Sequence, residues 1–261
     1  MQAASLAPGA GWQWVRDGLA LFRRQPMAMF TWALTIGFMV LIASILAPIG
    51  PLLFVVAMPA ITVMTLEACR AIEQGKTVLP LRLFAVLKAP GLARKLLAMG
   101  GVYVAAVLLA GLVAFLPFAE GLREAVQGLS SDDMGPVLAA MRAPIVLFAI
   151  FYVIIAGLFW HAPALVAWYR LDLRKALFFS GIACWRNKGA FLMYGATWLL
   201  VVLALELGGG LLEAIGLSGT ISGLIQMPFN FLAAAVLYCS FYPTYTSVFG
   251  PPPAAAFAAS P

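Results

Sequence analysis

Six long apolar stretches dominate this 261-residue chain and restrict what it can fold into. Each approaches or exceeds the ~20 residues that a helix needs to cross ~30 Å of hydrocarbon. The backbone must satisfy its own hydrogen bonds there, so such runs indicate helices. We place the spans at Met27–Ala47, Pro51–Cys69, Leu96–Ala119, Pro144–Ala167, Ala190–Leu207 and Ile221–Val248. The sequence therefore predicts an all-α, polytopic integral membrane protein with about six transmembrane helices.

The composition excludes the main alternatives. Hydrophobic residues make up 64% of the chain and charged residues only 10%, whereas soluble domains have about 45–50% and about 25%. A soluble fold of this size has no interior large enough for so much apolar surface. A transmembrane β-barrel would show segments of ~10 residues with alternating polarity, and that alternation is absent.

The basic residues predict the orientation. Segments 1–26, 70–95 and 168–189 hold 14 of the 16 lysines and arginines, and the opposite connections hold only Arg123 and Arg142. Basic connections stay on the cytoplasmic side, so both termini are expected in the cytoplasm. This asymmetry explains the net charge of +6 without a nucleic-acid partner. The expected partners are membrane lipids, with anionic headgroups at the cytoplasmic face.

An internal repeat is visible around the spans. Short, partly amphipathic segments (Trp12–Phe22, Leu81–Leu87 and Asp172–Trp185) precede the odd-numbered spans. The second helix of each hairpin contains a proline, which removes a backbone hydrogen bond and tends to kink the helix. These prolines are Pro59, Pro163 and Pro243. The pattern predicts three units, each an interfacial helix followed by a transmembrane hairpin.

The connections complete the expected layout. Residues 48–51 form a tight turn, residues 120–143 a longer acidic loop and residues 208–220 a glycine-rich loop. We expect one helical transmembrane domain over residues 1–250. The proline- and alanine-rich tail, residues 251–261, is predicted to be disordered.

Three short sequences resemble a group of bacterial inner-membrane proteins. They are Gly18-Leu-Ala-Leu-Phe-Arg-Arg-Gln-Pro26, Ala68-Cys-Arg-Ala-Ile-Glu-Gln-Gly75 and Arg186-Asn-Lys-Gly-Ala-Phe191. Similar helical regions also resemble the membrane part that accompanies some glycerophosphodiester phosphodiesterases, although no catalytic domain of that kind is present here. The resemblance implies a location in the bacterial inner membrane and implies no particular activity.

Four polar residues within the spans are candidates for a polar pathway: His161, Gln226, Asn230 and Glu67. Intramembrane ionisable groups are functional candidates by default. For each, the competing interpretation is structural. His161 would be a hydrogen-bonded packing residue, and Glu67 would form a helix-end ion pair with Arg70. Gln226 and Asn230, four residues apart on one helical face, would hydrogen-bond a neighbouring helix.

No motif in the sequence supplies a catalytic site, a cofactor site or a metal site. One histidine and three unpatterned cysteines give a metalloenzyme or a histidine-dependent hydrolase little to use. We therefore expect a non-enzymatic scaffold, assembly or envelope-homeostasis factor. The alternatives are a small transporter or channel with a polar path near His161, Gln226 and Asn230, and an accessory of a lipid-acting enzyme.

Overall fold

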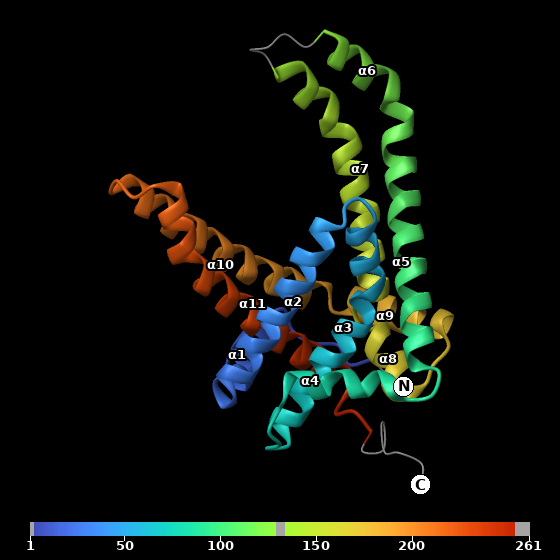
Figure 1. Cartoon of the computed structure of the whole chain (residues 1–261). Coiled ribbons are helices and arrows are strands. Elements are labelled where there is room, and N and C mark those ends of the chain that lie inside the picture. Colours follow the sequence, from blue (N-terminus) through green and yellow to red (C-terminus); the bar gives the residue numbers. More distant parts are fainter. Residues whose placement is uncertain (1–2, 129–133, 254–261) are drawn as a thin grey trace.

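The computed structural model describes residues 3–128 and 134–253, and all regular structure in these ranges is helical. Six helical segments are long and apolar enough to cross a membrane, which confirms the predicted fold class (Figure 1). The α-helices are α1 (Ala10–Arg24), α2 (Pro26–Ile45), α3 (Ile49–Glu73), α4 (Pro80–Leu83), α5 (Leu92–Phe115), α6 (Ala119–Gln127), α7 (Gly135–Trp160), α8 (Ala162–Tyr169), α9 (Leu173–Arg186), α10 (Lys188–Ala214) and α11 (Gly219–Phe249). Two 3₁₀ helices, η1 (Phe84–Lys88) and η2 (Leu116–Phe118), extend α4 and join α5 to α6.

The six predicted spans are all present, but the three expected connections are largely helical. The tight turn lies at residues 46–48 rather than 48–51, because α3 begins at Ile49. Within the predicted acidic loop, residues 120–127 belong to α6 and residues 135–143 to α7, and 129–133 lie outside the described residues. In the glycine-rich segment, α10 continues through residue 214. Charged residues indicate where a helix leaves the hydrocarbon, but they do not end the helix. Glu, Arg, Gln and Ala have high helix propensity, so the helix can continue into water. Gly209 allows close packing between α10 and α11, because a Cβ there would lie 2.5 Å from Oε1 of Gln226, whereas one on Gly208 or Gly210 would meet nothing within 4 Å.

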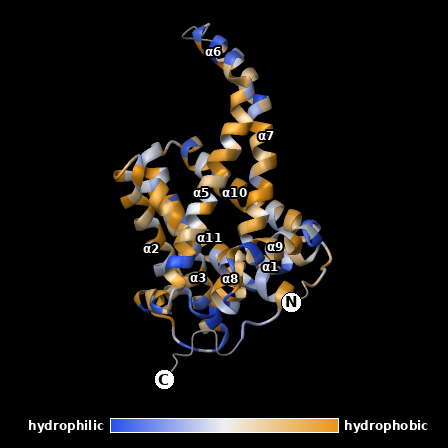
Figure 2. Ribbon diagram, turned by 90° about the vertical axis from the view of Figure 1, so that its right-hand side faces the viewer, coloured by the Kyte–Doolittle hydropathy of each residue, from blue (hydrophilic) through white to orange (hydrophobic). Residues whose placement is uncertain are grey.

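The order of the helices follows the three-unit plan. Helix α1 precedes the α2–α3 hairpin, α4 and η1 precede the hairpin of α5 and α7, and α9 precedes the α10–α11 hairpin. The hairpins rise from a shared base and spread apart, with α10 and α11 leaning away from α5 and α7 (Figure 1). Hydrophilic residues gather at that base and around α6 at the far tip (Figure 2). The predicted basic segments therefore lie at one end of the bundle.

Helix α1 connects the first unit to the third, because it packs chiefly against α11 and α10. Its buried face comprises Gly11, Trp14, Gly18, Leu21 and Phe22. The two glycines allow the helices to approach closely. A Cβ on Gly11 would lie 2.1 Å from the carbonyl oxygen of Ala190, and one on Gly18 would lie 2.6 Å from Cα of Ser240. The amphipathic segment predicted as Trp12–Phe22 thus packs across α10 and α11 and links them to the first hairpin, although Trp12 itself is half exposed.

Asn187, the residue between α9 and α10, anchors the N-terminal segment to the base. Its amide Nδ2 donates to the carbonyl oxygens of Ala4 and Ala183, and its Oδ1 accepts from the backbone N–H of Leu6. Farther along, the first residues of the predicted tail are also held, since the carbonyl of Pro253 accepts a hydrogen bond from Arg70. Residues 254–261 lie outside the described part of the chain.

Candidate functional site

The fourth span is broken at His161, where α7 ends and α8 begins. Pro163 cannot donate a backbone hydrogen bond to the preceding turn. In addition, the hydroxyl of Ser180 from α9 enters the broken ladder. It accepts from the N–H of His161 at 2.9 Å and donates to the carbonyl of Gly157 at 2.8 Å. A side chain inserted between a carbonyl and the N–H four residues later is a known cause of kinks, so the break is built into the sequence.

A cavity of about 420 Å³ lies beside this break. Helices α3, α5, α7, α8 and α11 line it. The lining contains no aspartate, glutamate, lysine or arginine, and its one titratable side chain other than tyrosine is His161. The wall consists of Phe54, Val55, Met58, Pro59, Thr62, Leu66, Tyr103, Tyr152, Ala156, Phe159, Trp160, His161, Pro163, Ala164, Phe241, Thr244 and Tyr245. Two of the three repeat prolines are thus in this wall. The volume falls within the range of small-molecule sites.

His161 belongs to the wall of the cavity and is only 2% exposed. Its ring meets those of Phe191, Tyr245 and Phe249 edge-on, with centroids 5.3–6.0 Å apart. Its Nε2 is buried without a hydrogen-bond partner. Of the structural interpretation, a hydrogen-bonded packing residue, the structure shows the packing, whereas Nε2 has no hydrogen-bond partner.

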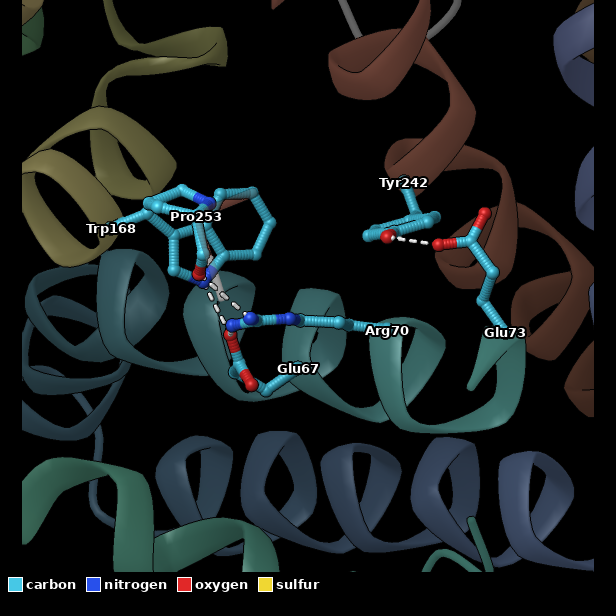
Figure 3. Close-up of polar contacts among 6 residues, drawn as sticks. All are labelled: Glu67, Arg70, Glu73, Trp168, Tyr242 and Pro253. Carbon is cyan, nitrogen blue, oxygen red and sulfur yellow. Dashed lines mark hydrogen bonds and ion pairs between the residues drawn. The ribbon is translucent and has the colours of Figure 1, made fainter. Parts of the chain in front are cut away.

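Glu67 lies in a separate polar cluster at the basic end of α3 (Figure 3). Its carboxylate forms the expected ion pair with Arg70, with Nη1 and Oε1 3.2 Å apart, and it accepts a hydrogen bond from the indole of Trp168. Arg70 also donates to the carbonyl of Pro253 at 2.8 Å. One turn later, Glu73 accepts from the hydroxyl of Tyr242 at 2.5 Å. The cluster joins α3, α8, α11 and the start of the tail.

Gln226 and Asn230 do not line the cavity. Gln226 donates from Nε2 to the carbonyl of Leu205 at 2.8 Å and so ties α11 to α10. Asn230 is exposed on α11. Of the four residues proposed for a polar pathway, the structure therefore places only His161 at the cavity. Glu67 is linked to the cavity through Trp168. The indole of Trp168 donates to Glu67 and packs against Tyr245, a residue of the cavity wall, with ring centroids 4.7 Å apart.

Hydroxyl groups on α11 bond to aromatic side chains of three other helices. Ser240 bonds to the hydroxyl of Tyr194, Thr244 accepts from the indole of Trp160, and Ser247 accepts from the indole of Trp14. Polar side chains within spans usually hydrogen-bond to a neighbouring helix, but the sequence does not show which partners these hydroxyls have. The importance of Ser180 was also missed, because an isolated serine in an amphipathic segment gives no sign that it will enter another helix.

No metal site is present in the described ranges, where no group of three or more His, Cys, Asp or Glu side chains comes together. The three cysteines are free thiols. Cys69 donates weakly to the carbonyl of Cys239, the group left without its helical donor by Pro243, with a 3.9 Å separation. Outside the spans, burial raises the pKa of the Cys184 thiol to about 12, so this thiol stays protonated and unreactive at neutral pH.

Comparison with known proteins decides the family. A protein of Burkholderia thailandensis named "probable inner membrane protein" is 36% identical over 260 residues, which cover 96% of this chain and 94% of the relative. The chain belongs to this family of inner membrane proteins. The bacterial inner-membrane group suggested by the short sequence resemblances is thereby confirmed. No family model matches the chain, and no solved structure matches it. Membership of this family indicates that the protein is located in the inner membrane, whereas the relative's name indicates no activity.

Proposed function

We propose that this inner membrane protein is a non-enzymatic scaffold that assists assembly or homeostasis of the envelope. The observation that carries the proposal is how the polar side chains at the base and along α11 are used. Glu67, Arg70 and Glu73 bond to other helices or to the tail, and so do the hydroxyls of α11. These contacts build a fixed base, which is what a scaffold requires.

The hairpins above that base supply the surface for other membrane proteins. Leu108 on α5 is 62% exposed, and Leu200 on α10 is 67% exposed. The two hairpins diverge, so these faces are open to whatever lies beside them in the bilayer (Figure 1). Association between transmembrane helices depends on close packing rather than on the hydrophobic effect, and rigid hairpins held by a common base favour such packing.

Site-specific photo-crosslinking in the membrane tests the scaffold function. A photoreactive residue at position 108 or 200 is expected to form a discrete protein adduct whose yield saturates with expression. Matched controls carry the same residue at Trp32 or Leu165, which are buried and should give no adduct with another protein. Adducts with lipid alone at the exposed positions would contradict the proposal, as would turnover by the purified protein that is lost on substitution of one polar residue.

The orientation is a further part of the proposal. The basic segments meet at one end of the bundle, together with the N-terminal segment and the start of the tail. Since basic connections remain in the cytoplasm, this end faces the cytoplasm and its lysines and arginines meet anionic headgroups, at about 1 kcal/mol for each residue near the surface.

Reporter fusions test this orientation. Alkaline phosphatase joined after Gly75, in the exposed turn between α3 and α4, is expected to be inactive because the enzyme folds only in the periplasm. The same reporter joined after Gly128, beyond α6, is expected to be active. A green fluorescent protein at both sites serves as the reciprocal control. Activity of the phosphatase after Gly75 would reverse the assignment.

Two other functions have specific support. The cavity beside His161 favours a small transporter, although a continuous polar path would have to include residues other than Gln226 and Asn230. The basic end favours an accessory of a lipid-acting enzyme, in line with the resemblance to the membrane part that accompanies some glycerophosphodiester phosphodiesterases. Lipid profiles of a deletion strain separate this last function from the scaffold, which leaves them unchanged.

A further inference from the structure

Asn230 on α11 carries a carboxamide that the described chain leaves unused. The residue is exposed, and its side chain forms no hydrogen bond within residues 3–128 and 134–253. The other carboxamide of this helix, Gln226, lies one turn away and donates to the carbonyl of Leu205 on α10. Two side chains of the same chemistry therefore lie in one helix, one paired within the molecule and the other not.

The unused carboxamide lies inside the hydrocarbon. Helix α10 has no charged residue between Lys188 and Glu206. These two residues are eighteen positions apart, which is roughly 27 Å along a helix and close to the ~30 Å of a hydrocarbon core. Glu206 thus indicates the edge of the core that is farther from the base. Gln226 bonds to the residue before Glu206, and Asn230 is one turn closer to the base, roughly 6 Å deeper.

The face of α11 that carries Asn230 is uncovered. The next residue, Phe231, packs against a ring on α2 with centroids 6.4 Å apart, and Gln226 faces α10. Asn230 lies between these two contacts and shares its face with Met227 and Gly223. Met227 is 52% exposed, and a Cβ on Gly223 would meet nothing within 4 Å. The α10–α11 hairpin leans away from α5 and α7 (Figure 1), which leaves this face open to the bilayer.

Lipid alone cannot satisfy the carboxamide. An unpaired polar group in hydrocarbon is costly, because no water reaches it. The ester oxygens of a phospholipid can accept from Nδ2, but they supply no donor for Oδ1. An unrelated transmembrane helix would have to present a polar residue at the same depth. A second copy of this chain necessarily does so, because its own Asn230 lies at that depth.

We propose that two copies of this chain associate through α11, with Asn230 at the contact. Copies inserted in the same direction are related by a two-fold axis along the membrane normal, so each residue meets its own counterpart. The carboxamide is self-complementary, since Nδ2 donates and Oδ1 accepts. The two Asn230 side chains bond to each other, and Gly223 allows the helices to approach closely. This association is independent of the scaffold function, which concerns other proteins.

Energy transfer between donor- and acceptor-labelled copies of the full chain, in vesicles of synthetic phosphatidylcholine, tests the association. The native protein is expected to follow a monomer–dimer isotherm as lipid dilutes it. Asn230→Leu should dimerise about tenfold more weakly, the loss of an interhelical hydrogen bond. Asn230→Gln keeps the carboxamide and should retain most of the affinity. The matched control Gln226→Leu removes the carboxamide that is paired within the chain and should dimerise as the native protein does.

Cysteine cross-linking locates the contact. Met227→Cys lies on the face of Asn230 and is expected to give a disulfide-linked dimer under mild oxidation, above the background from the three native thiols. Phe229→Cys is the control. Phe229 has a similar exposure, 55% against 52% for Met227, but a separation of two residues places it on nearly the opposite side of the helix.

Three results would contradict the proposal. Energy transfer that depends only on the density of acceptors in the membrane would mean that the copies do not associate. Equal association of the native protein and Asn230→Leu would place the contact elsewhere, and so would equal cross-linking at positions 227 and 229. Asn230 is exposed, so Asn230→Leu should fold normally, which circular dichroism checks. If it does not fold, the pair of cysteine variants still decides.

Discussion

Replacing Gly100 with valine is expected to destabilise the protein by about 3 kcal/mol or more, the upper part of the range for overpacking. Gly100 lies on α5 where that helix crosses α3, and a Cβ there would lie 1.9 Å from the carbonyl oxygen of Val56. The obstructing atom is backbone, so no change of rotamer can relieve the contact. Helix α5 has to move away from α3, and the second hairpin loses its packing on the first.

The adjacent glycine provides the control. Gly101 is exposed, and a Cβ there would meet nothing within 4 Å. Gly101→Val introduces the same side chain into the same helix and should leave stability within about 0.5 kcal/mol, as surface substitutions usually do. Reversible unfolding in mixed detergent micelles, followed by circular dichroism, measures both. Equal stability of the two variants would show that α5 does not cross α3 at this point.

Replacing Arg70 with methionine is expected to cost about 2–3 kcal/mol. Removing one member of a buried ion pair strands the other charge, at about 3–5 kcal/mol, and the side chains here retain 9% and 15% exposure, which lowers that figure. The variant also loses the hydrogen bond to the carbonyl of Pro253. We therefore expect the tail to detach and to be cut faster by protease, which mass spectrometry of the released peptide detects.

A double-mutant cycle separates the ion pair from its surroundings. Glu67→Gln alone leaves Arg70 without its carboxylate, whereas Glu67→Gln with Arg70→Met leaves no stranded charge. The double variant should therefore be more stable than the sum of the single changes implies, by about 1 kcal/mol or more. Glu73→Gln serves as a control, because an amide oxygen can still accept from Tyr242. Additive effects would mean that the pair contributes no coupling.

The fold was largely predictable, because its main constraints lie in local sequence. Apolar length gave the six spans, and the amphipathic segments and kink prolines gave the three units. The far ends of the hairpins were not predictable from the same signals. Residues 120–127 and 208–214 were expected to be loops but are helical. Polar residues show where the hydrocarbon ends but not whether the helix ends there. A glycine can indicate either a flexible loop or close helix packing, as at Gly209.

The candidate site was predictable only residue by residue. The single histidine stood out because polar groups in spans are rare, and the pair of Glu67 with Arg70 followed from their spacing. Which polar groups share a cavity depends on contacts between helices distant in sequence. Gln226 faces α10 rather than His161, and Ser180 reaches the broken helix from a separate segment. Such contacts are set by the tertiary packing of whole hairpins.

The bracing of α10 and α11 by α1 has a consequence for synthesis. A growing chain delivers its N-terminal part first, so Trp14 and Leu21 must wait for the last hairpin before they can be covered. Helix α1 therefore leaves the ribosome before α10 and α11 and can dock only after both have been inserted. A chain cut short before α10 would leave Trp14 and Leu21 uncovered, so quality-control proteases should recognise such a chain at α1.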